Sequence, residues 1–194
     1  MHPILLKSVN LFDPEPKGVC DLFLCGGIVA AVGKNLSPAL PDVEVVDGSG
    51  LTALPGLVDQ HVHFTGGGGE CGFRSRVPEL SLTDFTTAGV TTAVGLLGTD
   101  SATRSPKSLL AKTKALNEEG ITAYCLTGAY DVPSPTVTGS LKDDVAFISE
   151  ILGVKVALSD HRSGHPSLEQ LIHMASQVRL GALTAGKPGV VHIH

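Results

Sequence analysis

Tryptophan is absent from this 194-residue chain, and aromatic residues contribute only 4% of it. Such scarcity argues against a surface that stacks nucleobases on aromatic rings. Basic residues are also few, since 14 Lys and Arg stand against 19 Asp and Glu for a formal net charge of −5. This balance argues against the basic patch of a nucleic-acid-binding domain. Charged residues make up 17% of the chain and hydrophobic residues 42%, which excludes a disordered tail.

Long hydrophobic runs are missing as well. Gly, Pro, Asp or Lys interrupts each apolar run well before the ~18 residues that a membrane-spanning helix needs. The N-terminus lacks a basic segment followed by a long apolar stretch, so we expect no secretion signal. The four cysteines form no C-x-x-C pair, and we interpret them as reduced thiols of a cytoplasmic protein.

Glycine is plentiful, at 23 residues, and it divides the first part of the chain into short segments. Short β-like runs in residues 1–55 alternate with glycine-containing turns, which is typical of a small β-sandwich or sheet. We therefore expect an incomplete β-sandwich segment over residues 1–55. Pro55-Gly56 marks its boundary with a second domain, residues 56–194.

The second domain shows a different rhythm, in which apolar strand candidates recur about every 30 residues, the length of a strand-helix unit. The candidates are residues 57–63, 90–97, 121–127, 154–159 and 190–194. Repeated units of this kind predict a parallel sheet covered by helices, hence an α/β fold. Five units are too few for a complete (β/α)8 barrel of roughly 250 residues. The segment is either an open sheet or a partial (β/α)8 TIM-type barrel that is truncated after its fifth strand, and the terminal strand favours the barrel.

Helix signals lie between these strands. Ser105-Pro106 predicts a helix start and Gly120 its end. Ser140 with Asp143 resembles a capping pair, followed by apolar residues at helical spacing that include Ile151 and Leu152 and end at Gly153. Ser167 with Gln170 repeats the pattern, and Gly181 predicts the end of that helix.

The strongest candidates for chemistry are two histidines at the end of the first strand of this domain. His61 and His63 are two residues apart, so both side chains lie on the same face of a strand. Two imidazoles at that position are able to bind one metal ion. The alternative is a pair of solvent-facing or hydrogen-bonded histidines, but the preceding apolar strand, entered through Pro55-Gly56, favours the metal.

Lys155 and Glu70 are two further candidates. Strand alternation places Lys155 on the face opposite Val154 and Val156, so in a barrel its ammonium would point into the interior, where an unpaired charge is costly. The alternative is an edge-strand lysine in solvent. Glu70 follows a four-glycine loop, residues 66–69, whose missing side chains let a ligand approach the backbone. Most glutamates, however, are solvated surface groups.

Several segments resemble a known family. Residues 55–63 resemble the first-strand signature of the amidohydrolase superfamily, which comprises metal-dependent hydrolases built on a (β/α)8 barrel beside a small β-sandwich. Four further segments are similar to the isoaspartyl (β-aspartyl) dipeptidases of that superfamily: residues 66–70, 94–100, 126–130 and 159–163. The resemblance covers essentially the whole chain and corresponds to the N-terminal part of the family only.

This resemblance implies a dinuclear metal site. His61 and His63 would hold one Zn2+ or another divalent metal ion. Carbon dioxide would carboxylate Lys155, and the resulting carbamate would bridge two metal ions. His194 would begin the second metal site, while the neighbouring His192 would be a core or interior residue.

The resemblance also implies a reaction, the hydrolysis of isoaspartyl dipeptides by metal-activated hydroxide. Glu70 would bind the free α-amino group of the substrate and Arg162 its carboxylate. The phenol of Tyr130 would stabilise the carbonyl oxygen as it gains charge, so Tyr130 and Glu70 are the predicted catalytic residues. Gly68 and Thr99 would contact the substrate.

The sequence leaves two alternative functions open and predicts that the isolated chain is inactive. The resembled family takes a further metal-binding histidine and an aspartate from its sixth and eighth strands, so we expect the 194-residue chain to be inactive in isolation. A cyclic amidohydrolase of the dihydroorotase or hydantoinase kind would keep the histidines and Lys155. A non-catalytic interaction or structural product is the third hypothesis. The expected partners are a small dipeptide and, for the full-length family, further copies in a homo-oligomer; nucleic acid and membrane are not expected.

Overall fold

The computed structural model describes residues 2–194, which divide into two compact units, one ending at Gly56 and the other spanning Leu57–His194. Within the described residues, no helix is both long and apolar enough to cross a membrane. Each unit has its own sheet and its own buried cluster.

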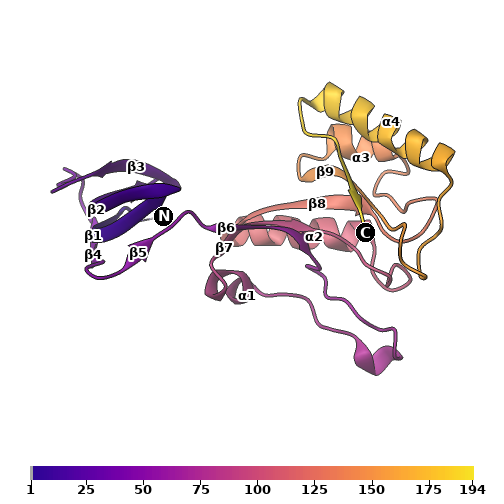
Figure 1. Ribbon diagram of the computed structural model, residues 1–194, viewed down its shortest axis with the longest axis horizontal. Helices are drawn as coiled ribbons and strands as arrows, with labels where there is room; N and C mark the ends of the chain where they lie inside the picture. The colour runs from indigo at the N-terminus through magenta and orange to yellow at the C-terminus, as the bar shows by residue number, and fades with distance from the viewer. Residues whose placement is uncertain (1) are drawn as a thin grey trace. The chain divides into compact units, whose positions relative to one another are not determined.

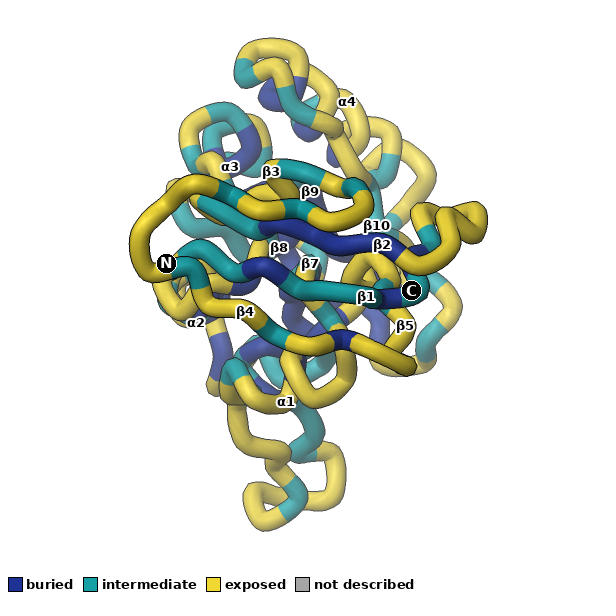
Figure 2. Tube along the Cα trace, turned by 90° about the vertical axis from the view of Figure 1, so that its left-hand side faces the viewer, coloured by how far each residue is buried: buried dark blue, intermediate teal, exposed yellow. Residues whose placement is uncertain are grey.

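The first unit is one five-stranded mixed sheet. Its strands are β1 (Ile4–Asp13), β2 (Glu15–Cys25), β3 (Ile28–Gly33), β4 (Glu44–Asp47) and β5 (Thr52–Ala53). β1, β2 and β3 form antiparallel pairs, whereas β4 and β5 both pair with β1 in parallel. Figure 2 shows the buried stretches of the two central strands, which contribute Val9, Leu11, Cys20 and Leu22 to a small apolar cluster.

The second unit is built on five parallel strands that neighbour one another in chain order. They are β6 (Leu57–Val62), β7 (Val90–Gly95), β8 (Thr122–Gly128), β9 (Ile151–Val156) and β10 (Val190–Ile193) (Figure 1). The sheet curls as half of a barrel. The fold class predicted from the sequence, α/β with a partial TIM-type barrel and an N-terminal β segment, is confirmed.

The connections between these strands hold the helices. They are α1 (Leu82–Thr87), α2 (Pro106–Glu119), α3 (Leu141–Phe147) and α4 (Leu168–Ala185), with a short 3-10 turn, η1, at Phe73–Ser75. The hydroxyls of Ser105, Ser140 and Ser167 each accept a hydrogen bond from a backbone N–H in the first turn of the following helix. Such caps satisfy backbone donors that have no partner within the helix.

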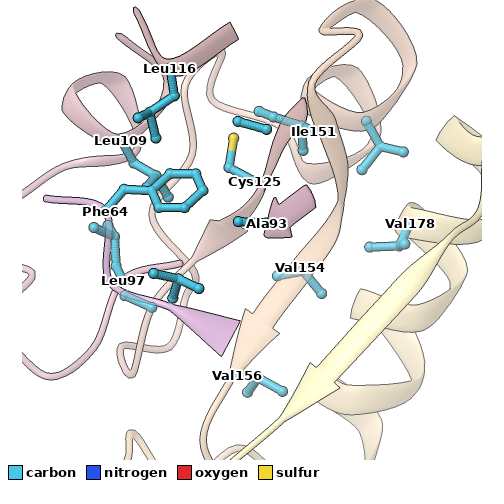
Figure 3. Packing of buried hydrophobic residues seen from close by; sticks show 14 of the residues in the cluster. Phe64, Ala93, Leu97, Leu109, Leu116, Cys125, Ile151, Val154, Val156 and Val178 are labelled. Carbon is cyan, nitrogen blue, oxygen red and sulfur yellow. The ribbon is translucent and has the colours of Figure 1, made fainter. Parts of the chain in front are cut away.

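The core of the second unit lies between the sheet and these helices. Figure 3 shows Phe64 and Leu97 packing near Leu109 and Leu116 of α2, with Val154 and Val156 of β9 toward Val178 of α4. Phe64 contacts Phe85 of α1 edge-to-face, with ring centroids 5.7 Å apart. This apolar layer fixes the helix-facing side of each strand and so leaves the opposite side for polar groups.

Two predicted helix boundaries were wrong. α3 ends at Phe147, because Ile148 is already extended, and Ile151 and Leu152 belong to β9. Apolar residues at helical spacing cannot be told from the start of a buried strand over so short a run. Gly181 does not end α4, which continues to Ala185 and is capped by left-handed Gly186. A Cβ at Gly181 would lie 2.5 Å from the carbonyl oxygen of Lys142, so this glycine lets α4 pack closely on α3.

Candidate metal and substrate site

Four histidines from the two outer strands of the parallel sheet meet in one cluster. The His61 ring lies 5.6 Å from that of His63, 4.9 Å from that of His192 and 6.0 Å from that of His194, measured between centroids. Nδ1 of His61 and Nε2 of His192 are 2.9 Å apart, within hydrogen-bond distance. β6 and β10 stand at opposite ends of the strand order, so only the curl of the sheet brings these rings together.

Lys155 is completely buried beside this cluster. Its Nζ lies 5.7 Å from the centre of the Tyr130 ring, and among residues 2–194 no carboxylate comes within ion-pair distance of it. Burial lowers the pKa of Lys155 to about 8. Alternation along β9 explains its position, because Val154 and Val156 pack into the apolar core on the other face.

Three of the four imidazoles have a lowered pKa, which favours their neutral form. Burial and then the nearby Lys155 lower the pKa of His61 to about 4, and the same two causes lower the pKa of His63. Burial also lowers the pKa of His192. A neutral imidazole keeps the nitrogen lone pair that a metal ion binds.

The donor set fits a divalent metal ion in its chemistry. Imidazole nitrogens suit zinc, and a buried amine without an anionic partner is a group that an added carboxylate would turn into an oxygen donor. Within the described part of the chain, no three His, Cys, Asp or Glu side chains are already arranged around a common point for a metal ion. The fit therefore rests on the histidines together with Lys155, and not on histidines and carboxylates alone.

Tyr130 and Asp160 lie beside His194 of the cluster. The Tyr130 ring is buried, with its centroid 5.5 Å from that of His194. Burial and the charge of Asp160 raise the pKa of its phenol, which therefore keeps its proton at neutral pH. The carboxylate of Asp160 accepts hydrogen bonds from Nε (2.8 Å) and Nη2 (2.5 Å) of Arg162, and it lies 3.8 Å from Nε2 of His194.

Glu70 is part of a second polar network at the mouth of the site. Its Oε1 accepts hydrogen bonds from Oγ1 of Thr99 at 2.7 Å and from Nη1 of Arg162 at 2.8 Å. The Glu70 side chain is 48% exposed, so its charge also faces solvent. A carboxylate and a guanidinium at one opening are complementary to a ligand that carries both an amine and a carboxylate.

One cavity of about 440 Å3 joins the two networks. Its walls include His63, His194 and all five residues predicted to contact substrate, namely Gly68, Glu70, Thr99, Tyr130 and Arg162. His61, Lys155 and His192 do not line this cavity. A larger cavity of about 850 Å3, between the loop after β8 and the start of α4, contains none of these residues.

The predicted site residues therefore come together in the structure, whereas three neighbours were not singled out from the sequence. His192 was expected to be a core or interior residue, yet it contacts His61 as closely as any other ring. Asp160, which orients Arg162, and the buried Arg104 had no assigned role. The two-residue spacing between Asp160 and Arg162, at the end of a strand, was the one signal available for the first of them.

The chain is similar to solved structures over nearly its whole length. No family model matches the chain. The crystal structure of the beta-aspartyl dipeptidase from Fervidobacterium islandicum AW-1 is 44% identical, with a TM-score of 0.93 over 99% of this chain and 53% of the other. Its complex with a beta-Asp-Leu dipeptide gives 44% identity and a TM-score of 0.92, covering 99% of this chain and 50% of the other.

Curated relatives match a shorter segment. A dihydroorotase from Solibacter usitatus is 38% identical over 64 residues, which is 32% of this chain and 14% of that protein. A D-phenylhydantoinase from Escherichia coli is 38% identical over 61 residues, or 31% of this chain and 13% of the other. The chain thus spans a small part of these curated relatives and about half of the dipeptidase. In sequence and fold it is similar to that half of a beta-aspartyl dipeptidase, consistent with the N-terminal part, and the resemblance predicted from the sequence is confirmed.

Proposed function

We propose that this chain carries the metal-binding and substrate-recognising residues of a hydrolase that cleaves β-aspartyl dipeptides. The observation that carries the proposal is the cavity that His63 and His194 of the histidine cluster line together with Tyr130 and the Glu70–Arg162 pair. The 44% identity to a dipeptidase solved with beta-Asp-Leu supports it.

The metal site would use His61, His63, His194 and Lys155, the last as a carbamate. Two zinc ions or other divalent cations, when bound, would lower the pKa of a bound water and polarise the carbonyl group of the substrate. The buried amine of Lys155 supports carboxylation, because a carbamate replaces an unpaired buried cation with an anion that the cations would neutralise.

The remaining residues would recognise the aspartyl end of the substrate. The carboxylate of Glu70 is suited to the α-amino group, and the planar fork of Arg162 to the α-carboxylate. Tyr130 keeps its phenolic proton, so it is able to donate a hydrogen bond to the carbonyl oxygen as negative charge develops there. Gly68 and Thr99 would complete the wall of the cavity around the ligand.

The metal part of the proposal is tested by zinc binding. Equilibrium dialysis in bicarbonate buffer should show bound zinc in the wild-type chain, and the double variant His61→Asn/His63→Asn should bind it at least about tenfold more weakly. The matched control is His2→Asn/His173→Asn, because both of these histidines are exposed and neither is one of the four rings of the cluster. Equal zinc binding by the two double variants would refute the metal site.

The reaction is tested with β-Asp-Leu. The resembled family takes further metal-binding and proton-transferring residues from later strands, so we propose that residues 1–194 alone bind the dipeptide without turning it over. Calorimetry should show binding that is weakened in Glu70→Gln. Robust hydrolysis by a verified 194-residue polypeptide would contradict the inactivity, and binding unaffected by Glu70→Gln would contradict the recognition.

A cyclic amidohydrolase is the second candidate, favoured by the 38% identity to a dihydroorotase and a D-phenylhydantoinase. Glu70 discriminates between the two, because a cyclic amide has no free α-amino group to bind it. Competition between β-Asp-Leu and dihydroorotate for the zinc-loaded chain decides the matter. Preferential binding of dihydroorotate that survives Glu70→Gln would favour this second function.

A further inference from the structure

Arg104 is a buried cation at the base of the glycine loop. It directly precedes Ser105, the cap of α2, and is only 8% exposed. Its Nη1 donates to the carboxylate of Asp100, which neutralises the charge. A guanidinium withdrawn from water is costly unless its donors are satisfied, so the partners of the remaining donors reveal why it is there.

Those partners are backbone carbonyls at both ends of one loop. Nε donates to the carbonyl oxygen of Thr65 at 2.7 Å, and Nη2 donates to that of Val77 at 3.0 Å and that of Gly67 at 3.4 Å. Thr65 and Gly67 lie where the chain leaves β6, and Val77 lies where it returns toward α1. One planar side chain thus joins the two ends of residues 65–77, which a point charge such as an ammonium does less well.

The other hydrogen bonds that order the loop run mainly between its own residues, such as the one from the N–H of Gly69 to the carbonyl oxygen of Ser75 at 3.3 Å, and they include a β-bridge between Gly68 and Arg76. Gly66, Gly68 and Gly69 all have positive φ angles, which only glycine adopts readily, and they gain the most conformational freedom when the loop opens. A Cβ at Gly66 would lie 2.1 Å from the carbonyl oxygen of Val77, so the two ends must stay close. The N–H of Val77 donates to the carbonyl oxygen of Gly67 at 2.8 Å, but no residue between 67 and 77 is buried.

Glu70 sits in this loop, and its position depends on where the loop lies. Thr99, which donates to Glu70, directly precedes Asp100, the charged partner of Arg104. Arg104 therefore ties the loop that carries Glu70 and the loop that carries Thr99 to a single guanidinium. We infer that Arg104 is a positioning residue, which holds Gly68 and Glu70 at the rim of the cavity and in register with Thr99 and Arg162.

The role of Arg104 in ligand recognition rests on the proposed function, but the first test, of whether Arg104 holds the loop, does not. Amide hydrogen exchange resolved along the sequence should show faster exchange in residues 66–77 of Arg104→Met, by about tenfold or more, since one hydrogen bond to a charged group is worth about that factor. Arg104→Lys keeps the charge next to Asp100 and should restore only part of the protection. Exchange in α2 and α4 should stay unchanged, which shows that the variants remain folded.

Arg76 supplies the matched control. It is an arginine within the same loop whose Nη2 also approaches Asp100, at 3.8 Å, but its side chain is 36% exposed and, unlike Arg104, donates no side-chain hydrogen bond to a loop carbonyl. Arg76→Met should leave exchange in residues 66–77 close to wild type. Equal exchange in Arg104→Met and wild type, with the fold intact, would overturn the inference, as would equal acceleration in Arg76→Met.

A second measurement connects the loop to ligand recognition. Calorimetry with β-Asp-Leu and the zinc-loaded chain should give an affinity about tenfold lower for Arg104→Met, partly restored in Arg104→Lys and unchanged in Arg76→Met. Accelerated exchange combined with unchanged affinity would overturn the positioning role. A wild-type chain that binds no dipeptide would instead count against the proposed function, while the exchange data would still decide whether Arg104 holds the loop.

Discussion

At the scale of single residues, burial decides which side chains are chemically available. Lys155 of β9 and Tyr130, just after β8, are both buried, whereas Glu70 remains half-exposed. The cysteines differ in the same way: Cys125 lies in the core between the sheet and α2, and Cys71 is exposed in the glycine loop region. A thiol reacts through its thiolate, so these environments separate reactive from inert cysteines.

We predict that iodoacetamide at pH 8 modifies Cys71 within the folded chain and leaves Cys125 unmodified. Burial raises the pKa of Cys125 to about 11, so in the folded state it stays protonated until well above the pH at which an unfolded thiol ionises. Between about pH 9 and pH 11 the native thiol therefore binds more protons than the unfolded one, and this contribution to stability falls as pH rises. Peptide mass spectrometry after alkylation, with and without urea, measures how far each of the two cysteines is modified. Modification of Cys125 at pH 8 without urea would contradict the prediction.

At the scale of elements, the sequence predicts some helix and strand boundaries correctly and misses others. Pro106 and Ser105 start α2 as predicted, because capping is a local effect within one turn. The start of β9 and the continuation of α4 past Gly181 depend on contacts with elements that lie far away in the sequence, which local patterns do not contain. In the site, the spacing of His61 and His63 was visible, whereas the partners of Arg104 appear only once the loops have folded together.

Asp144 is the clearest case of such a hidden tertiary role. This completely buried carboxylate in α3 accepts hydrogen bonds from Oγ1 of Thr127 (2.6 Å), the N–H of Val137 (2.9 Å) and both the N–H (2.8 Å) and Oγ1 (2.7 Å) of Thr138. It therefore connects β8, the following loop and α3 at one point.

We predict that Asp144→Ala lowers the free energy of unfolding by about 3 kcal/mol, because several buried donors lose their acceptor. Asp143→Ala is the control, since its side chain accepts none of these bonds and the neighbouring Ser140 cap uses only its backbone N–H. Urea denaturation followed by circular dichroism measures the difference. A loss below about 1 kcal/mol, or an equal loss in both variants, would show that Asp144 is not the connecting group.

At the scale of the whole 194-residue polypeptide, the edges of the parallel sheet are the most consequential feature, because within residues 2–194 β6 and β10 each have a neighbouring strand on one side only. β6 and β10 end the strand order on either side. Leu57 and Val58 of β6 are about as exposed as Ile193 of β10, and Val190 is also partly exposed. Unpaired strand edges with apolar side chains are ready templates for pairing with another chain.

We predict that the chain associates in a concentration-dependent manner and that Val190→Lys weakens this association, because a charged side chain on an edge strand opposes pairing. Leu183→Lys, on the exposed side of α4, is the control for a lost apolar group that is remote from a sheet edge. Sedimentation velocity over a range of concentrations distinguishes the two variants. Equal association in Val190→Lys and wild type would place the contact elsewhere.

Gly98, in the loop after β7, limits which substitutions the site tolerates. A Cβ there would come within 2.6 Å of the His63 ring, and a Cβ at Gly95 within 2.3 Å of the Phe64 ring. A mutant library that keeps the histidines and Lys155 but randomises position 98 would therefore displace the imidazole of His63 in nearly all of its members. Such libraries should therefore keep Gly98 unchanged together with the histidines, because the missing side chain at position 98 leaves the space that the His63 ring occupies.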